Sequence, residues 1–413
     1  MPANAATGTV GEVPSRNTPW LLSSTPMQNV RRLVPCGDLM YAVGTISAVG
    51  QGSHTYTRGN AFSFSQTTGA VTAWNPAVNG PVNDIALSPD CRTAYLGGSF
   101  TSVHGTSATN IAAVDTTTGA VKSSFRHNSG AAVYTVDYTH GQILVGGAFG
   151  NINGAARTEF ASLDPSTGTV TPYANLAISG RYPRTSKKID NSQLSHSGNK
   201  LLVEGVFTSI GGHARQQVAV FDLGATTVTL DGWNASGLAQ SCVLSETYYT
   251  RSAAWSPDDQ TIYGVSTGYH PLSGPGSSTS QPRAGLCDAA FAFSAASTAQ
   301  NPLWINYTGC DSYYGVVADS QNVYVGGHER WANNPNGCDS AGPGALSRPG
   351  LADLDPVGGS ANSWNPTRAL GHGADDLVLT PAGLWVASDT FKQGKAQMCG
   401  HQTNHGGICF LPY

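Results

Sequence analysis

The stretch from Pro81 to His127, PVNDIALSPDCRTAYLGGSFTSVHGTSATNIAAVDTTTGAVKSSFRH, decides the fold that this sequence predicts. It holds four short runs rich in Val, Ile, Leu, Phe or Tyr, which are separated by Ser-Pro-Asp, Gly-Gly and Thr-Thr-Gly turn sequences. Short apolar runs between such turns are typical of antiparallel strands joined in hairpins. The stretch therefore predicts one four-stranded antiparallel sheet.

The same unit recurs in degenerate form along the chain, and its second strand sets the register of seven copies. The second-strand segments begin at Met40, Ala94, Ile143, Leu201, Ile262, Val323 and Leu384. Repeats of roughly 50 residues fit β-propellers, in which each repeat forms one blade. We therefore expect an all-β, seven-bladed β-propeller with four-stranded blades, whose blades start near residues 30, 82, 133, 191, 250, 313 and 374.

One aromatic residue marks the fourth strand of most copies. These aromatics are interpreted as wedges between neighbouring blades, with sugar stacking as the alternative: Trp74, Phe125, Tyr173, Trp233, Trp304 and Trp364. The seventh aromatic is Trp20, ahead of the first copy, whereas the last copy ends after its third strand. We expect residues 16–23 to supply the outer strand of the last blade and to close the ring. On this view residues 1–15 are a flexible segment and residues 16–413 form a single domain.

Aspartates recur in the turns between strands. Asp115, Asp164 and Asp355 open the turn that follows the third strand, and there we expect them to accept backbone N–H bonds. Metal binding is the alternative for these three. Asp258 and Asp259 match the Ser88-Pro89-Asp90 turn and are interpreted as part of a hairpin turn, not as a catalytic pair.

A recurrent motif gives the chain a family resemblance. The pattern Y-x-G-G-x-F-T-S-V-x-G, followed by A-x-x-D-x-x-T-G-x-V-x-x-W-N-P, resembles the secreted bacterial propeller repeats of the delta-60 and PQQ-like kind. It is also similar to kelch blades in the placement of its paired glycines. The resemblance covers nearly the whole chain and implies a fold; these families include sensors, adhesins, lyases and oxidases, so it implies no single function. The fifth and seventh copies lack the paired glycines, and no cofactor motif is present.

Composition narrows the partners and the compartment. With 50 Gly, 23 Pro and only 11% charged residues, the 413-residue chain is typical of a turn-dense β protein. A formal net charge of -4 provides no basic field, so we expect no nucleic-acid or membrane partner, and we expect a monomer. The Ala-x-Ala run near Met1 matches the end of a signal-peptide cleavage region, which favours a mature secreted protein with an added Met; an ordinary N-terminus is the alternative.

Eight cysteines, an even number, favour disulfides and an extracellular location. The expected pairs are Cys36 with Cys91, Cys242 with Cys287, Cys310 with Cys338 and Cys399 with Cys409, although about 105 connectivities are open. The alternative for the last pair is a tetrahedral zinc site, formed by Cys399, His401, His405 and Cys409. No other cofactor is expected.

Long loops and the first strands of the blades locate the expected site. Five long segments fall on the face where the first strands begin: residues 174–188, 234–250, 268–286, 328–348 and 391–407. The first strands should line a common axis with Arg31 and Arg32, Asn83 and Asp84, Tyr134 and Thr135, Ser192 and Gln193, Arg251 and Ser252, Tyr314 and Gly315, and Asp375 and Asp376. A merely solvated lining is the alternative reading of these residues.

The chemistry of this lining suggests roles for its members. Arginine suits bidentate binding of a carboxylate or phosphate, and tyrosine or histidine beside it can transfer a proton. We expect Arg31, Arg32 and Arg251 to bind substrate, with catalysis by Tyr134, Tyr314, His372, Asp84, Asp375 and Asp376. The segment His328-Glu329-Arg330-Trp331 departs from the repeat and is predicted to contact a ligand, with a local ion pair stacked on tryptophan as the alternative.

Three functions are compatible with these residues. The first is a secreted enzyme that processes a glycan or another polar substrate in the axial funnel: a lyase if the substrate is a uronate, a glycoside hydrolase if it is neutral. The second is a non-catalytic, lectin-like or adhesive propeller, and the third is a tailoring enzyme that cyclises a small molecule. The sequence lacks the G-x-S-x-G, H-E-x-x-H, phosphate-loop and dinucleotide motifs, which disfavours those enzyme classes.

Overall fold

The computed structural model describes residues 8–22, 27–182, 185–186, 188–235, 238, 249–268, 285–296, 301–368, 373–389, 398–399, 402–403 and 406–413. Over these residues the chain is built of short antiparallel β-strands. No helix within the described ranges has the length and apolar character that crossing a membrane requires.

Seven sheets of three or four strands make up most of the described chain. In order of sequence they are β2 (Asn29–Cys36), β3 (Leu39–Thr45) and β6 (Ala61–Ser65); β7 (Val82–Leu87), β8 (Thr93–Gly98) and β11 (Ile111–Asp115); β12 (Val133–Thr139), β13 (Gln142–Gly147) and β16 (Phe160–Leu163); β18 (Lys188–Leu194), β19 (Lys200–Val206), β22 (Val218–Leu223) and β23 (Val228–Leu230); β24 (Tyr249–Trp255), β25 (Thr261–Thr267), β26 (Ala289–Ser294) and β27 (Trp304–Tyr307); β28 (Tyr313–Ala318), β29 (Val323–Gly327) and β32 (Leu351–Leu354); and β33 (Ala374–Thr380), β34 (Gly383–Ser388) and β37 (Ile408–Pro412). We refer to them as the first to the seventh sheet.

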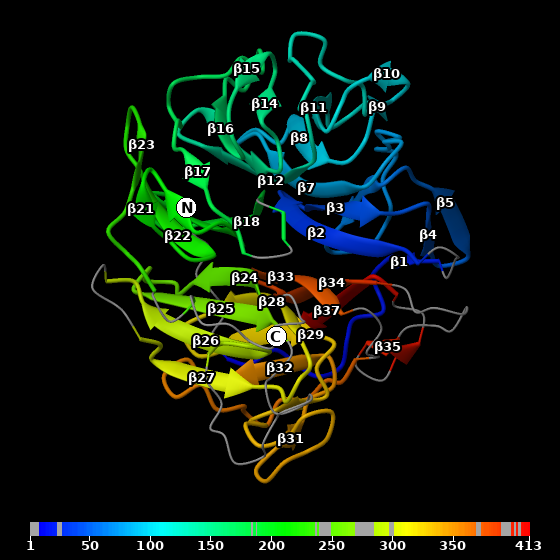
Figure 1. Cartoon of the computed structure of the whole chain (residues 1–413). Coiled ribbons are helices and arrows are strands. Elements are labelled where there is room, and N and C mark those ends of the chain that lie inside the picture. Colours follow the sequence, from blue (N-terminus) through cyan, green and yellow to red (C-terminus); the bar gives the residue numbers. More distant parts are fainter. Residues whose placement is uncertain are drawn as a thin grey trace.

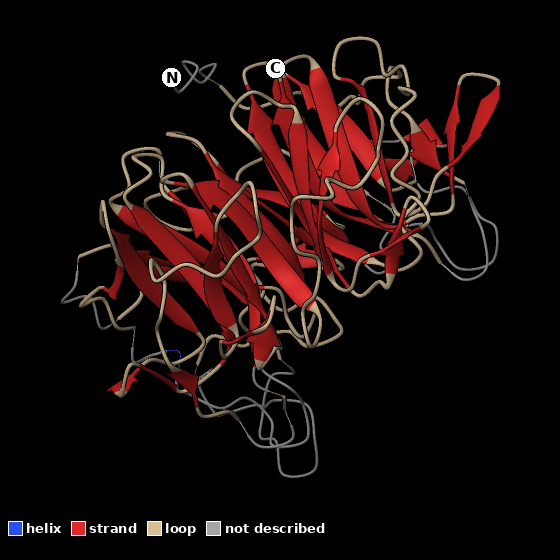
Figure 2. Cartoon of the chain, turned by 90° about the horizontal axis from the view of Figure 1, so that it is seen from above, coloured by secondary structure: helices blue, strands red, loops and turns tan. Residues whose placement is uncertain are grey.

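The sheets are arranged around a common centre, toward which their first strands β2, β7, β12, β18, β24, β28 and β33 lie (Figure 1). Figure 2 shows the same sheets from the side, lying next to one another with loops at both ends of the strands. Each first strand begins within three residues of the position expected from the repeat. The largest difference is in the fourth sheet, where β18 begins at Lys188.

Small hairpins lie at the periphery, away from the common centre (Figure 1). They are β1 (Trp20–Leu21) with β4 (Ala48–Gln51) and β5 (His54–Thr57); β9 (Ser102–Val103) with β10 (Thr106–Ser107); β14 (Asn151–Ile152) with β15 (Ala155–Ala156); β17 (Ile178–Ser179) with β20 (Ser209–Ile210) and β21 (His213–Ala214); β30 (Trp331–Ala332) with β31 (Leu346–Ser347); and β35 (Met398–Cys399) with β36 (Gln402–Thr403). Most of these hairpins connect the second strand of a sheet to its third.

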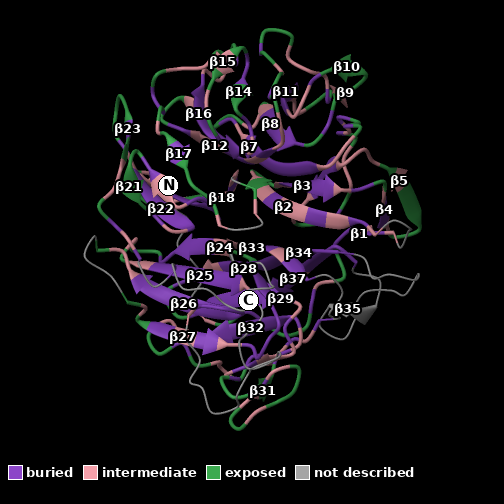
Figure 3. Cartoon of the chain, in the orientation of Figure 1, coloured by how far each residue is buried: buried purple, intermediate pink, exposed green. Residues whose placement is uncertain are grey.

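The hydrophobic core lies between neighbouring sheets. One cluster joins Tyr41 and Val43 of the first sheet to Leu96 and Val114 of the second. Burial follows the strands of the seven sheets, whereas peripheral segments such as β5 and β10 are exposed (Figure 3). Both faces of each sheet are covered by a neighbouring sheet. The sequence of a strand is therefore a nearly continuous apolar run, and apolar and polar residues do not alternate strictly along it.

The outer strands differ from the prediction of four-stranded blades. Only the fourth and fifth of the described sheets have a fourth strand, β23 and β27. Elsewhere the outer strand is reduced to a single bridge, such as Val114 with Val121. In the first and sixth copies an Asn-Pro pair follows the aromatic directly, and proline has no N–H to continue the ladder.

The aromatics of these outer segments act as wedges, as predicted. The Trp74 indole packs edge-on against Tyr41, with ring centroids 5.2 Å apart, and its Nε1–H donates to the carbonyl oxygen of Asp115 in the next sheet at 3.1 Å. Trp233 and Trp304 bond the following sheet in the same way. All six aromatics are at most 7% exposed, so the alternative of sugar stacking is wrong: Trp74, Phe125, Tyr173, Trp233, Trp304 and Trp364.

The N-terminal segment follows a different register from the predicted one. Trp20 pairs with Gly50 in β4 and not with the seventh sheet, so the outer position predicted for Trp20 was wrong. Instead the N–H groups of Gly11 and Ser15 donate to the carbonyl oxygens of Pro412 and Phe410, at 2.7 and 2.8 Å, along the outer edge of β37. These bonds satisfy backbone groups of an edge strand, and Val10 beside them is buried. Residues 1–7 lie outside the described part of the chain.

The turn aspartates have the structural role predicted for them. Asp115 Oδ1 accepts the N–H groups of Thr117 and Thr118, both at 2.9 Å, and Asp164 and Asp355 bond their turns in the same pattern. Asp258 Oδ1 likewise accepts the Ser256 hydroxyl at 2.6 Å. These bonds occupy the carboxylates and explain why aspartate recurs at this position of the turns.

Disulfides join sheets and close loops. Cys36 is bonded to Cys91, which links the first sheet to the turn between β7 and β8, and Cys310 is bonded to Cys338. These two predicted pairs are confirmed. Cys287 and Cys409 are also disulfide-bonded. The side chains of their expected partners, Cys242 and Cys399, lie outside what the structure describes.

Candidate functional site

Every first strand carries one irregularity at the same position. The register of each first strand with its neighbour shifts by one residue there, which is a β-bulge. The bulged residues are Arg31, Asn83, Tyr134, Asp190, Arg251, Tyr314 and Asp375. A bulge re-aims a side chain that regular alternation would turn toward the neighbouring sheet. Seven bulges in equivalent places therefore gather seven side chains.

The bulged residues line one cavity of about 480 Å³, which we call the front funnel. It opens at the end of the first strands where the chain enters them, and it is lined by Met27, Asn29, Arg31, Arg32, Thr45, Asn83, Tyr134, Lys188, Asp190, Asn191, Thr250, Arg251, Tyr314 and Asp375. This volume is sufficient for a small polar molecule.

Cationic groups outnumber anionic ones in the front funnel. Four side chains are positively charged, Arg31, Arg32, Lys188 and Arg251, against the two carboxylates Asp190 and Asp375. Lys188 Nζ lies 2.5 Å from Asp190 Oδ1 and 5.0 Å from the centre of the Tyr134 ring. Burial raises the pKa of Asp190, and the lysine opposes that shift. Leaving out Arg32, which pairs with Asp84 and Asp376 below the funnel, three cations still face two carboxylates, so the lining carries a small net positive charge.

Tyr314 and His328 form the arrangement in the front funnel that is best suited to proton transfer. The phenol oxygen of Tyr314 lies 2.8 Å from His328 Nδ1, while His328 Nε2 accepts the backbone N–H of Ser312 at 3.3 Å. That second bond places the proton of a neutral imidazole on Nδ1, where it donates to the phenol oxygen. The guanidinium of Arg251 lies over the Tyr314 ring, 4.5 Å from its centre. Both neighbours stabilise negative charge on the phenol.

A buried ion pair supports Tyr314 from behind. Arg368 Nη2 lies 2.7 Å from Asp389 Oδ1, and both side chains are almost fully buried. The same two side chains hold the backbone of Gly373, whose carbonyl accepts Arg368 Nη2 at 3.2 Å and whose N–H donates to Asp389 at 3.3 Å. A Cβ at Gly373 would lie 2.4 Å from the Tyr314 ring, so the ring packs directly on this glycine. The ion pair thus fixes the surface against which Tyr314 rests.

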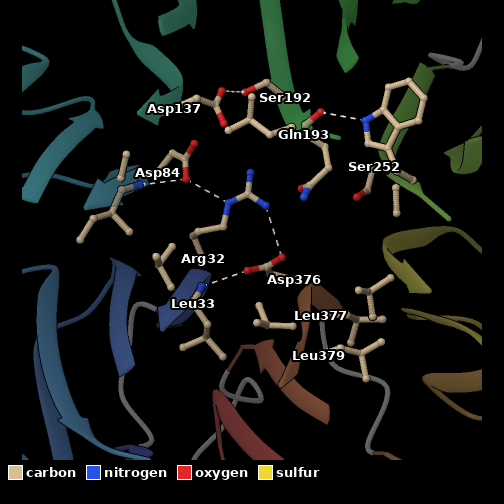
Figure 4. A pocket seen from close by; sticks show the side chains of 18 of the residues that line it. Arg32, Leu33, Asp84, Asp137, Ser192, Gln193, Ser252, Asp376, Leu377 and Leu379 are labelled. Atoms are coloured by element: carbon tan, nitrogen blue, oxygen red, sulfur yellow. Dashed lines mark hydrogen bonds and ion pairs between the residues drawn. The ribbon is translucent and has the colours of Figure 1, made fainter. Parts of the chain in front are cut away.

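Arg32 lies on the axis below the front funnel and binds three other sheets. Its guanidinium contacts Asp84 at 3.0 Å and Asp376 at 3.3 Å (Figure 4). It also donates to Asn191 Oδ1 at 2.6 Å. Burial disfavours the charged guanidinium, but the carboxylates of Asp84 and Asp376 outweigh it and raise the pKa of Arg32. Arg32 lines the front funnel and also a second cavity at the opposite end of the first strands.

This second cavity, the rear pocket, has a volume of about 440 Å³ (Figure 4). Its polar groups are Arg32, Asp84, Asp137, Ser192, Gln193, Ser252 and Asp376, with His196 also in its lining. Its walls are apolar and include Leu33, Leu194, Trp255, Leu377 and Leu379. The axial channel therefore consists of two chemically different cavities on either side of one arginine.

The predicted axis residues divide between these places. Arg31, Tyr134, Arg251, Tyr314 and Asp375 meet in the front funnel. Arg32, Asp84 and Asp376 instead bind one another, because two carboxylates and a guanidinium on neighbouring strands neutralise each other when buried. We predicted substrate binding for Arg32 and catalysis for the two aspartates. These three side chains are bonded to one another, so they are not available to a substrate in this arrangement.

The alignment of the fourth sheet was wrong by two residues. Asp190 and Asn191, not Ser192 and Gln193, occupy the positions of Arg31 and Arg32 in the first sheet. The local signal was present in the sequence, because Ile189 precedes the bulge as Val30 and Val82 do in the first two sheets, although the fifth sheet has Thr250 there. Lys188 was missed as well, and nothing in the repeat pattern singles it out.

The residues of the segment His328-Glu329-Arg330-Trp331 lie in three different environments. His328 bonds Tyr314, as described above. Glu329 is fully buried, so its predicted contact with a ligand is wrong. Arg330 pairs with Asp311 at 2.8 Å and lies over the Trp331 ring, 4.5 Å from its centre, which is the alternative of a local ion pair.

Two predictions concern residues beyond the described ranges. The predicted catalytic residue His372 lies outside them, as do His401 and His405 of the zinc alternative. Cys409, the fourth member of that alternative, is disulfide-bonded. Within the described part of the chain, no group of three or more His, Cys, Asp or Glu side chains is placed to hold a metal ion.

Comparison with known proteins bears on the fold alone. No protein-family model matches the chain, and no curated protein is significantly similar to it. Two similar solved structures are U3-55K and the WD40 repeats of RRP9, each with 9% sequence identity. The first has a TM-score of 0.53 and covers 97% of this chain and 100% of its own; the second has a TM-score of 0.52 and covers 97% and 98%. WD40 repeats form β-propellers, so the likeness shows a β-propeller fold.

Proposed function

We propose that this chain is a secreted, seven-bladed β-propeller whose front funnel binds a small polar ligand that carries a carboxylate, such as a uronate of a glycan. The observation that carries the proposal is the set of seven equivalent bulges. Their side chains converge on one cavity in which cationic groups outnumber carboxylates. Such a cavity favours an anionic ligand over its neutral counterpart.

Closure of the ring is supported by contacts between the first and the last sheet. The Phe64 ring of the first sheet lies 5.5 Å from the Trp385 ring of the seventh, between centroids. Residues 11 to 15 lie along the outer edge of β37. A Cβ at Gly69 would clash with the carbonyl of Asn17, as one at Gly119 would with that of Asn75. Asn17 thus occupies, for the last blade, the place of the residue after the wedge.

The disulfides support secretion. Cys36–Cys91 and Cys310–Cys338 are bonded, and no described cysteine is free. Stable disulfides form and persist in oxidising compartments. Mass measurement of the protein under non-reducing conditions tests this point, since free thiols on all eight cysteines would contradict it.

The groups in the funnel suit a carboxylate on a hydroxylated ring. Arg31 and Arg251 offer planar donor pairs for the carboxylate. The amides of Asn29 and Asn83 are bonded to Asp375 and Arg31 and hold these charged groups at the wall, where Tyr134 adds an aromatic ring beside a sugar's hydroxyls. A uronate carries both kinds of partner.

Calorimetric titration with glucuronate and with glucose tests the proposal. We expect glucuronate to bind about tenfold or more tightly than glucose, because glucose lacks the charge that the arginines would pair. Arg251→Ala should abolish that preference, whereas Arg92→Ala, which removes an exposed arginine from a hairpin turn, should leave it unchanged. Equal binding of both sugars, or an unchanged preference in Arg251→Ala, would overturn the proposal.

A second candidate function, a uronate lyase, is favoured by the pair of Tyr314 and His328. In β-elimination a base removes the proton next to the carboxylate, the electron pair forms a carbon–carbon double bond, and the glycosidic oxygen leaves with a proton. Tyr314 is the candidate base, because His328 and Arg251 both stabilise its phenolate. Tyr314→Phe should then abolish formation of the unsaturated product while ligand binding persists. Binding without product in the unaltered chain would instead favour the lectin-like alternative.

The other enzymatic alternatives receive less support. A hydrolase requires two carboxylates that flank the scissile bond, and Asp84 and Asp376 are engaged by Arg32. No contact of the described residues favours the cyclase alternative in particular.

A further inference from the structure

We propose that the rear pocket is a second binding site, which takes a primary amine attached to an apolar body. This site goes beyond the function proposed for the front funnel and does not depend on it, because Arg32 and its partners lie between the two cavities. The inference rests on the contacts of one carboxylate, on the walls of the pocket and on its size.

The carboxylate is that of Asp137, on β12. Asp84 and Asp376 each accept a bond from Arg32 and one from a backbone N–H, of Val136 and Leu33 respectively. Asp137 instead accepts a neutral donor, the Ser192 hydroxyl, at 2.5 Å (Figure 4). Within the described ranges no Lys or Arg forms an ion pair with it.

The environment of Asp137 is that of a carboxylate lacking a cation. Burial, and the nearby carboxylate of Asp84, raise the pKa of Asp137 to about 6, and the hydroxyl of Ser192 and the charge of Arg32 compensate only in part. Apart from Arg32 and Asp84, the titratable side chains in the lining are Asp376, which is bound to Arg32, His196, which is bound to Asp259, and Tyr138, whose ring packs against Tyr95. An ammonium group would supply the missing charge, and amines are ionised at neutral pH.

The rest of the pocket specifies the body of the ligand. Leu33, Leu194, Leu377 and Leu379 form apolar walls, and Trp255 adds an aromatic surface. The amide of Gln193 and the hydroxyl of Ser252 add polar groups to the lining (Figure 4), and each can accept a bond from a polar group of the ligand. A volume of about 440 Å³ admits a ligand the size of an aromatic amine.

Titration of the whole chain with benzylamine tests the inference, with benzyl alcohol as the neutral counterpart of the same shape. We expect benzylamine to bind at neutral pH, and benzyl alcohol to bind at least about tenfold more weakly, because only the amine compensates Asp137. Asp137→Asn keeps the shape of the side chain and should weaken benzylamine to the level of the alcohol. Arg251→Ala, in the front funnel, should leave benzylamine binding unchanged.

A second variant separates loss of the site from loss of the fold. Leu379→Trp keeps every charge of the pocket but fills its wall with a larger side chain, so it should also prevent benzylamine binding while the glucuronate titration of the front funnel stays as in the unaltered chain. Absence of benzylamine binding, equal affinity for the alcohol, or binding that survives both Asp137→Asn and Leu379→Trp would each overturn the inference.

Discussion

Glu204 offers the sharpest test of how this fold treats buried charge. It lies on β19, directly opposite Asn191, at the position that glycine occupies as Gly97 in the second sheet and Gly146 in the third. Its side chain is fully buried, and neither carboxylate oxygen meets hydrogen-bond geometry with a described residue. The backbone N–H of Ala253 favours the charged form but does not replace the lost hydration, so the buried carboxyl holds its proton.

The size of the effect follows from the pKa. Burial raises the pKa of Glu204 from an ordinary value of 4.5 to about 8; the backbone N–H of Ala253 and the charge of Arg32 oppose the shift, and Asp190 adds to it. At about 1.36 kcal/mol per pH unit, this interval corresponds to an effect on the order of 5 kcal/mol on the free energy of unfolding. Below pH 4.5 the group is protonated in both states, so it has no effect on the pH dependence there.

The sign of the effect is fixed by which state binds the proton. Between these two pKa values the unfolded chain releases the proton of Glu204 and the folded chain keeps it, so folding stability falls as the pH rises through this range. Glu204→Gln removes the titration and should stabilise the protein progressively, relative to the unaltered chain, from about pH 5 to about pH 9. Glu329, which is also buried, is present in both proteins and cancels in the difference.

The assay is urea denaturation of both proteins across that pH range with the disulfides intact. Glu12→Gln, a change at an exposed glutamate, serves as the matched control and should follow the unaltered chain. If the stability curves of the Glu204→Gln variant and the unaltered chain ran parallel from pH 5 to pH 9, the carboxyl would titrate normally and the reasoning would be refuted.

Three further predictions concern the contacts that hold the sheets together, each measured by urea denaturation. Trp74→Ala, which removes a wedge between the first two sheets, should cost about 3–5 kcal/mol; a loss below about 1 kcal/mol would contradict its role. Replacing Cys36 and Cys91 together by Ala should cost about 2–5 kcal/mol, because their disulfide joins two sheets, and reduction of the native protein, which also breaks Cys310–Cys338, should cost at least as much. Arg368→Met should cost about 3–5 kcal/mol by leaving Asp389 charged and buried, and adding Asp389→Leu should recover much of it; equal losses in the single and the double variant would contradict this account.

The local features of the fold could be predicted because they depend on short segments. The Asp115 turn and the Trp74 wedge recur at fixed distances from the second strand of a repeat, and Cys36 and Cys91 stand just before the second strands of two adjacent copies. The error at Trp20 has the same origin: an aromatic near a proline matched the motif, although the backbone bonds to the last sheet come from Gly11 and Ser15.

The repeat also indicated where the bulge lies in the fourth sheet, and our alignment of that sheet did not use this signal. A bulge shifts the alternation of side chains by one residue, and a shift of one residue exchanges the two faces of a strand. Asp190 and Asn191 could therefore be assigned only by aligning Ile189 with the valines that precede the bulge in the first three sheets, Val30, Val82 and Val133.

The sequence by itself determined the strands, their turns and the spacing of the copies. It also determined which polar residues stand near the start of each first strand. All four features depend on neighbours within about 50 residues along the chain. Only the tertiary structure decided which of those polar groups neutralise one another. Arg32 meets Asp376 across 344 residues and Asp84 across 52, while in the described part of the chain Asp137 is bonded by the hydroxyls of Ser192 and Thr135 and not by a lysine or arginine. The physical reason is that ion pairing depends on distances of a few ångströms, and these are set by how the sheets pack around their common centre.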